Sequence, residues 1–429
     1  MPAFVFPGQG SQRHGMGRPW KDHPSWELVV DASEAAERDL AWLLLDADDE
    51  TLTETRHAQL ATFTMGLLVL DAVERLGIEP TSCAGHSVGE YTALVAAGAV
   101  GFEDGIRVVA ERGEAMQAAA DAKAGVMVLL EGCTFDTADI ACHMADGEVW
   151  VANVNTPEEA VIAGEPQAVA RAADHALRLG GRRVTPVAVG GAFHTPFMAP
   201  ARDRLRKALA TTPFHEPDAA VVANVDARPH DTDDEWALLL SAQLVSPVRW
   251  RDSLLCLAGQ GAITRHPVHE ELFVEVGPGG SLSRMIRSTI PGATTVAVSS
   301  PADLDHLVDV VAGDAAYRRY AAGHQGARLY VSERMVVSPT AGVFNPTSLD
   351  ILGLDSPVGA EIGVGTLLGS VSGTDVRSPF DGRLMGVLAH PGERVQAGQP
   401  IAWLRTSETG ETGESAESMA TGRSEGTAK

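Results

Sequence analysis

A serine stands between two glycines in residues 85–89, whose sequence is G-H-S-V-G, and this segment limits the folds open to the chain. The residues before it lean apolar, as in a short strand, and residues 90–97 have the composition of a helix. Small residues on both sides allow a sharp turn from strand to helix, which exposes the serine oxygen at the helix N-terminus. The pattern predicts an α/β fold with Ser87 as a candidate nucleophile.

Strand-like and helix-like segments alternate along residues 1–320, as expected for an α/β domain. Residues 3–6 form a short strand pattern that ends at the glycine-rich loop 7–12. We expect this main domain to end near residue 320. Its further strands are predicted at 221–223 and 272–276, and its helices at 24–45, 58–76, 238–244, 252–258 and 302–311.

Residues from about 124 to 190 have a different pattern, with short strands and helices in the order β-α-β-β-α-β. This order is typical of a ferredoxin-like α+β subdomain, which would be inserted between Ser87 and His194. The predicted strands are 126–130, 149–154, 160–163 and 184–189, and the predicted helices are 135–145 and 168–179.

Composition excludes several classes of partner. The chain has 429 residues and a formal net charge of −24, which argues against nucleic acid and anionic membranes, because phosphates need a basic face. Its apolar runs are too short to span a bilayer, and no charged-then-apolar leader precedes residue 4. The four cysteines lack metal-binding spacing, so we expect no metal site, buried thiols and a reducing cytoplasmic location.

A serine nucleophile needs a base, and His194 is the candidate in the segment G-A-F-H-T-P at residues 191–196. We expect it at the end of the strand 184–189, after a glycine pair. Histidine titrates near neutrality, so it can take the serine proton and return it. The alternative is an ordinary surface or core histidine, one of 14 in the chain.

Five segments together resemble the malonyl-CoA:acyl carrier protein transacylases, in order from about residue 4 to about residue 298. That resemblance implies a hydrolase-like α/β acyltransferase domain with a ferredoxin-like insertion. The segments are F-P-G-Q-G-S-Q at 6–12, G-H-S-V-G-E-Y at 85–91, Arg112, A-F-H at 192–194 and V-E-V-G-P-G at 274–279.

The resemblance implies that Ser87 accepts an acyl group from coenzyme A and passes it to the phosphopantetheine thiol of an acyl carrier protein. The backbone N–H groups of Gln9 and Val88 would form the oxyanion hole. A main-chain carbonyl, here that of Gln243, would orient His194 in place of an acidic residue. Malonyl-CoA is then a substrate, and no bound cofactor is expected.

The same resemblance assigns acyl recognition to Arg112, which would hold the free carboxylate of malonyl in a bidentate fork. The alternative is a helix arginine paired with Glu111 or Glu114. Phe193 before the histidine and Val88 after the serine favour malonyl, although Gly191 departs from the histidine common in modular relatives.

Gln59 and Asn155 also match pocket positions of the family. Gln59 would line the acyl site, and Asn155 would support the edge of the insertion. Each could instead be a structural amide whose hydrogen bonds are satisfied within the fold.

Carrier proteins of this family are typically acidic, so binding one on this acidic chain requires a local patch of basic residues. The alternative is a solvated charged face with no partner. The candidates are Arg178, Arg182, Arg183, Arg284 and Arg287.

Residues 329–405 are expected to form a separate, small all-β barrel-sandwich domain. The near-repeats S-P-T-A-G at 338–342 and S-P-F-D-G at 378–382 resemble biotinyl or lipoyl carrier domains. No lysine lies between Lys207 and Lys429, so neither biotin nor lipoate can be attached. We expect either a docking domain for an assembly partner or a folding appendage, followed by a disordered tail at 406–429.

Two other functions use parts of the same pattern. An acyl-thioester hydrolase that clears carrier proteins would need Ser87 and His194 but not Arg112. A non-catalytic assembly factor built around the β domain would need none of the three.

Overall fold

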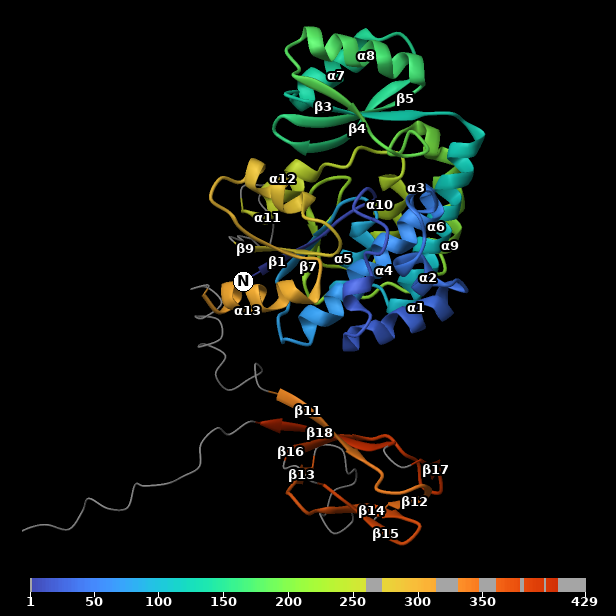
Figure 1. Cartoon of the computed structure of the whole chain (residues 1–429), viewed down its shortest axis with the longest axis vertical. Helices are drawn as coiled ribbons and strands as arrows, with labels where there is room; N and C mark the ends of the chain where they lie inside the picture. The colour runs from blue at the N-terminus through green and yellow to red at the C-terminus, as the bar shows by residue number, and fades with distance from the viewer. Residues whose placement is uncertain are drawn as a thin grey trace, which may run out of the picture. The chain divides into compact units, whose positions relative to one another are not determined.

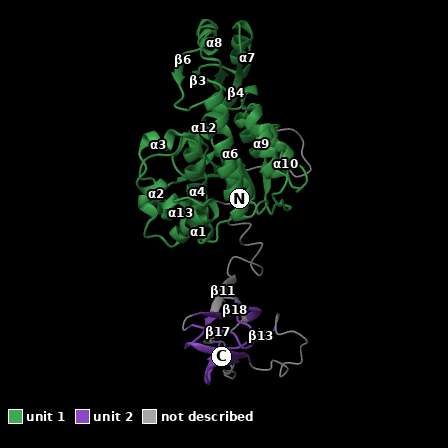
Figure 2. Ribbon diagram, turned by 90° about the vertical axis from the view of Figure 1, so that its right-hand side faces the viewer, with its two compact units in different colours: residues 1–320 green, residues 321–429 purple. Residues whose placement is uncertain are grey.

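The computed structural model describes residues 2–259, 272–313, 331–346, 360–378, 382–396 and 399–407. The chain divides into two compact units, residues 1–320 and 321–429 (Figure 2). The predicted tail lies almost wholly outside the described residues.

A six-stranded sheet forms the centre of the first unit, in the order β10-β9-β1-β2-β7-β8. The strands pair in parallel except β8, which is antiparallel to β7. Phe4 and Phe6 pack into the core on one side of β1, and Ala3 and Val5 pack on the other. The strands are β1 (Pro2–Phe6), β2 (Ser82–Gly85), β7 (Ala220–Val222), β8 (Pro229–His230), β9 (Leu272–Val276) and β10 (Thr294–Val298).

Helices cover both faces of this sheet (Figure 1). Helices α4, α5 and α6 pack on the Phe4 side, and α11 and α12 pack on the Ala3 side. Both faces are therefore buried, as in other parallel sheets. The α-helices are α1 (Glu27–Ala36), α2 (Leu40–Leu45), α3 (Asp49–Thr53), α4 (Thr55–Glu74), α5 (Gly89–Ala96), α6 (Phe102–Ala122), α9 (Ala199–Leu209), α10 (Trp236–Gln243), α11 (Trp250–Leu257), α12 (Ser281–Thr289) and α13 (Leu304–Gly313), with 3-10 turns η1 (Arg18–Trp20), η2 (Pro24–Trp26), η3 (Pro196–Met198) and η4 (Pro301–Asp303).

The inserted subdomain has a four-stranded antiparallel sheet in the order β4-β5-β3-β6. This is the strand order of a ferredoxin-like subdomain. A second small core lies between the sheet and helices α7 and α8. The elements are β3 (Val126–Glu131), α7 (Phe135–Met144), β4 (Val149–Thr156), β5 (Glu159–Gly164), α8 (Pro166–Arg178) and β6 (Arg183–Pro186).

Two predictions about element boundaries were wrong. The predicted helix 24–45 is divided, because Glu37 ends α1 in a left-handed conformation and Asp39 caps α2 through the N–H of Trp42. The predicted strand 184–189 ends at Pro186, although the N–H of Val187 still donates to the carbonyl of Met127 in β3. His194 therefore lies in a loop before η3 and not at the end of a strand.

The second unit contains two four-stranded sheets, β11-β18-β16-β13 and β15-β14-β12-β17, around one core. The two serines of the near-repeats, Ser338 and Ser378, are both buried, and each donates its backbone N–H to a carbonyl oxygen. The strands are β11 (Val331–Val337), β12 (Gly342–Pro346), β13 (Glu361–Ile362), β14 (Leu367–Val371), β15 (Thr374–Arg377), β16 (Gly382–Val387), β17 (Arg394–Val395) and β18 (Pro400–Ser407).

Candidate active site

Ser87 occupies a tight turn between β2 and α5, with a positive φ of 56°. The turn is possible because of the glycines on either side. A Cβ on Gly85 would lie 1.9 Å from the carbonyl carbon of Gly89, and a Cβ on Gly89 would lie 2.1 Å from the carbonyl oxygen of Phe6. The two glycines therefore allow the serine to stand at the N-terminus of α5 in a conformation that costs a non-glycine residue free energy.

His194 is brought to the serine from a loop 107 residues further along the chain. Its Nε2 lies 2.8 Å from Ser87 Oγ, and its Nδ1 lies 2.8 Å from the main-chain oxygen of Gln243 at the end of α10. A carbonyl can only accept a hydrogen bond, so Nδ1 carries the proton and Nε2 is free to accept from the serine hydroxyl. This is the tautomer that a general base requires.

The environment keeps His194 uncharged. Burial, followed by the positive charge of Arg112, lowers the pKa of His194 to about 3, although the hydrogen bond to Gln243 favours the protonated ring. The imidazole is therefore neutral near pH 7 and ready to take a proton. A cation formed there during a reaction would need stabilisation by the Gln243 carbonyl.

Arg112 projects from α6 to the same place and is fully buried. Its Nη2 donates to Ser87 Oγ at 3.1 Å and to Gln243 Oε1 at 2.8 Å, and its Nη1 donates to Gln59 Oε1. Gln59 in turn donates to the side-chain oxygen of Gln9 at 2.8 Å. These four residues and Ser87 thus form one hydrogen-bonded network.

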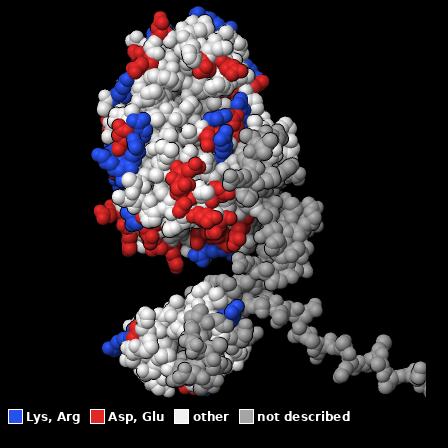
Figure 3. Space-filling view, turned by 180° about the vertical axis from the view of Figure 1, so that it is seen from behind, with Lys and Arg blue, Asp and Glu red and all other residues white. Residues whose placement is uncertain are grey.

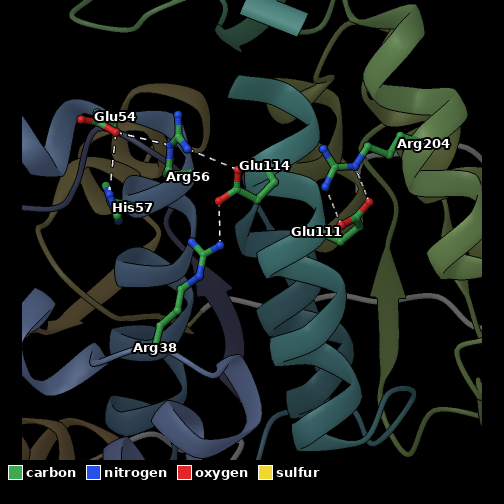
Figure 4. A network of polar contacts seen from close by, with 7 residues as sticks. All are labelled: Arg38, Glu54, Arg56, His57, Glu111, Glu114 and Arg204. Atoms are coloured by element: carbon green, nitrogen blue, oxygen red, sulfur yellow. Dashed lines mark hydrogen bonds and ion pairs between the residues drawn. The ribbon is translucent and has the colours of Figure 1, made fainter. Parts of the chain in front are cut away.

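Neither neighbouring glutamate on α6 pairs with Arg112, because both have other partners. Glu111 accepts two hydrogen bonds from Arg204, and Glu114 lies 2.6 Å from Arg38 and 3.5 Å from Arg56 (Figure 4). Among the described residues no carboxylate forms an ion pair with Arg112. Its charge is instead surrounded by amide oxygens, a hydroxyl and the ring of Tyr91, whose centroid is 5.3 Å from the guanidinium carbon.

The other predicted residues lie around this network. Val88 and Phe193 are buried next to Ser87 and His194. Within the described chain, the backbone N–H groups of Gln9 and Val88 donate to no protein acceptor, so both are free for an oxyanion. Asn155, on β4 of the insertion, lies 3.2 Å from Nε2 of His86, which links the insertion to the serine turn.

The sequence analysis missed two buried residues, Glu90 and Asn224. Asn224 accepts from the backbone N–H of Ser87 at 2.9 Å and donates to the carbonyl of Gly85 at 2.7 Å, so it holds the turn from both sides. Glu90 accepts from the backbone N–H of Asn224 at 3.0 Å and from the side chain of Gln243. The sequence position of Asn224 could have indicated a role. It follows strand β7, and residues at the carboxyl ends of parallel strands commonly line binding sites.

The five candidate docking arginines are exposed but differ in their pairing. Arg182 lies 3.0 Å from Glu158, and Arg183 lies 3.4 Å from Glu131, so both are partly neutralised. Arg178, Arg284 and Arg287 have no acidic partner among the described residues, and Arg287 donates to the hydroxyl of Thr295 at 2.6 Å. Figure 3 shows one face of the main unit on which acidic side chains gather in larger groups than basic ones.

Neither a membrane-spanning helix nor a metal-binding cluster is present among the described residues. None of their helices has the length and apolarity to cross a membrane. They also contain no group of three or more His, Cys, Asp or Glu side chains arranged to hold a metal ion.

A serine at a strand-to-helix turn, a neutral histidine and free backbone N–H groups define an enzyme of the serine-dependent acyl-transfer class. The chain belongs to the acyl transferase domain family, whose model matches residues 3–300.

Relatives and solved structures agree with that family. The chain is 36% identical over 314 residues to the malonyl CoA-acyl carrier protein transacylase of Bacillus subtilis, covering 72% of this chain and 96% of the relative. A solved transacylase of that name from Xanthomonas oryzae has 38% identity and a TM-score of 0.67, covering 72% and 97% of the two chains. A malonyl-transacylase solved in complex with a type II polyketide acyl-carrier protein has 32% identity and a TM-score of 0.67, covering 72% and 99%.

Proposed function

We propose that this chain transfers a malonyl group from coenzyme A to the phosphopantetheine thiol of an acyl carrier protein, through a malonyl ester of Ser87. Support comes from the family and from the geometry of Ser87, His194 and Arg112. The observation that carries the proposal is Arg112, a fully buried cation 3.1 Å from the nucleophile with no ion-paired carboxylate in the described chain.

In the first half-reaction Ser87 Oγ attacks the thioester carbonyl carbon, and His194 Nε2 takes the serine proton. The backbone N–H groups of Gln9 and Val88 hold the oxyanion of the tetrahedral intermediate. The C–S bond then breaks, and His194 returns the proton to the sulfur of coenzyme A. The product is malonyl-Ser87 with a neutral imidazole beside it.

The second half-reaction runs the same steps with a new thiol. His194 takes the proton of the carrier's phosphopantetheine thiol, whose sulfur attacks the ester carbonyl. The bond to Ser87 Oγ breaks, and the serine recovers its proton from His194. The enzyme returns to its starting state without water or a bound cofactor entering the cycle.

Arg112 gives the reaction its selectivity in this proposal. Arg112 is buried and forms no ion pair with a carboxylate among the described residues, so the carboxylate of a malonyl group on Ser87 would pair with it in bidentate geometry. An acetyl group offers no such charge. Malonyl should therefore be favoured over acetyl on the enzyme.

The test is intact-mass measurement of the chain mixed with malonyl-CoA, followed by addition of a carrier protein that holds its phosphopantetheine arm. We expect a malonyl adduct on the wild type, its absence from Ser87→Ala, and its transfer to the carrier. An adduct that survives Ser87→Ala would refute the proposal. Release of free malonate with no loaded carrier would indicate a hydrolase instead.

We further propose that the carrier docks through the candidate arginines that have no acidic partner among the described residues, Arg178, Arg284 and Arg287. Carrier proteins of this family are typically acidic, and rim charges of opposite sign speed association. Replacing Arg284 with Glu should raise the KM for the carrier and leave malonyl-Ser87 formation unchanged. An equal effect on both steps would argue against docking there.

For the second unit we propose a biotinyl- or lipoyl-like barrel-sandwich that has become a docking domain. Its two four-stranded sheets and the near-repeats support that architecture. The absence of any lysine between Lys207 and Lys429 rules out the usual attached arm. A variant that ends at residue 320 should still form malonyl-Ser87, and failure to do so with the fold intact would contradict this role.

A further inference from the structure

We propose that Glu90 is a positioning residue for acyl selection, acting through the side-chain amide of Gln243 to aim Arg112 at the acyl group on Ser87. This inference rests on the proposed function and adds two side-chain roles to it. The sequence analysis predicts a role only for the main-chain carbonyl of Gln243 and no role for Glu90.

The Gln243 side chain joins four groups of the site. Its Oε1 accepts from Arg112 Nη2 at 2.8 Å, and its Nε2 donates to the carbonyl of Ser87 at 2.9 Å, to Asn224 Oδ1 at 3.4 Å and to Glu90 Oε2. The side chain is almost wholly buried, as is Glu90. Gln243 therefore contacts the arginine, the nucleophile's backbone and the buried carboxylate at once.

The partners of this amide allow only one of its two orientations. Arg112 can only donate, whereas the Ser87 carbonyl and an ionised Glu90 can only accept. A flipped amide would place N–H against the guanidinium and an oxygen against three other oxygens, those of the Ser87 carbonyl, Glu90 and the Asn224 side chain. Glu90 thus helps to keep the Gln243 oxygen directed at Arg112.

Glu90 is itself held in place by the protein backbone. Its Oε1 accepts from the N–H of Asn224 at 3.0 Å, so both carboxylate oxygens are used as acceptors. Burial raises the pKa of Glu90 to about 7, against the effect of these hydrogen bonds. At pH 8 the carboxylate is therefore ionised and the amide orientation is fixed.

Arg112 depends on these contacts for its direction. Its other side-chain hydrogen bonds are to Gln59 and to Ser87 Oγ, and the latter is the atom that becomes acylated. Once Ser87 carries an acyl group, the hydrogen bonds to Gln59 and Gln243 remain to direct the guanidinium, beside the ring of Tyr91. Loss of the Gln243 orientation should therefore harm recognition of a carboxylate and leave an acetyl group unaffected.

The test compares malonyl-CoA and acetyl-CoA as donors for wild type and Glu90→Gln at pH 8, with a phosphopantetheine-bearing carrier as acceptor. We expect the ratio of the malonyl to the acetyl kcat/KM to fall about tenfold, as for loss of one hydrogen bond to a charged group. Because it is a ratio, it does not depend on the fraction of enzyme that is folded. An unchanged or increased ratio would overturn the inference.

Gln243→Ala is the second variant, because it removes the side chain and keeps the carbonyl that orients His194. It should lower the same ratio, and adding Glu90→Gln to it should produce no further fall, since both changes act on one contact chain. Additive effects of the two substitutions would contradict a role of Glu90 through Gln243.

Glu275→Gln is the matched control, since Glu275 is another fully buried glutamate of the same unit. Its oxygens accept from the backbone N–H groups of Leu282 and Ser283, at 3.1 and 2.7 Å. This change should lower stability and leave the malonyl-to-acetyl ratio at the wild-type value. A fall in its ratio equal to that of Glu90→Gln would show a general structural effect and overturn the inference.

The same data separate this inference from the proposed function. If the wild type forms no malonyl-Ser87, the proposed function fails. If the wild type prefers malonyl and Glu90→Gln keeps that preference, only the role of Glu90 fails.

Discussion

Arg112 Nη2 lies 3.1 Å from Ser87 Oγ, so a buried positive charge and the candidate nucleophile share a hydrogen bond. A guanidinium in that place lowers the pKa of His194 and favours the neutral base. It also offers a carboxylate-binding fork next to the atom that becomes acylated. Under the proposed function, one side chain would therefore affect both the base and the choice of acyl group.

Arg112→Ala should reduce malonyl transfer about 100-fold more than acetyl transfer. The reason is the loss of two charge-assisted hydrogen bonds to the acyl carboxylate, each worth about 1.5 kcal/mol or more. The measurement is kcat/KM for both donors with the same carrier. Equal loss of both activities would count against a carboxylate clamp.

Glu114→Gln should leave the malonyl-to-acetyl ratio unchanged, although residue 114 is only two positions from Arg112. Its carboxylate pairs with Arg38 and Arg56 at the partly exposed side of α6, where ion pairs contribute about 1 kcal/mol or less. Thermal unfolding should shift slightly while selectivity stays constant. A changed ratio would revive the alternative in which Arg112 pairs along its own helix.

Gly85→Ala should abolish soluble, active protein or destabilise it by about 3 kcal/mol or more, because its Cβ would overlap the backbone of Gly89. Gly77→Ala is the control. Gly77 also has a positive φ, of 72°, but a Cβ there meets nothing within 4 Å, so only a conformational cost of about 1 kcal/mol is expected. Urea unfolding of the two variants measures the difference, and equal losses would mean that steric overlap is not the cause.

The free energy of unfolding of the wild type should fall relative to that of Glu90→Gln as the pH rises from about 4.5 to about 7. Burial raises the pKa of the folded carboxyl from 4.5 to about 7, so the folded state holds the proton more tightly than the unfolded state does. Between these values the folded state binds more protons, and stability falls with rising pH. Urea unfolding of both proteins at pH 4.5, 6 and 8 measures this, and a constant difference would contradict the assignment.

Local pattern was enough to predict the serine turn and the main strands. The G-x-S-x-G pattern predicts a turn because its small residues let the strand and helix backbones approach closely. The strand at 272–276 is apolar except for Glu275, and it is buried along its whole length, as a strand of a parallel sheet is. The resemblance to the transacylases agrees with the family model that matches residues 3–300. Boundaries set by one residue, such as the left-handed Glu37 or the strand end at Pro186, were not predicted.

Which residues meet was decided by the tertiary structure. Glu111, Arg112 and Glu114 are close in sequence, but a helix turns by 100° per residue, so their side chains leave α6 in different directions. Only packing shows that Arg112 faces the core and that the two glutamates face other arginines. The sequence by itself determined the candidate nucleophile, the candidate base and the type of fold. The buried contacts of Glu90, Asn224 and the Gln243 side chain join residues as far apart as 156 positions, which no local pattern encodes.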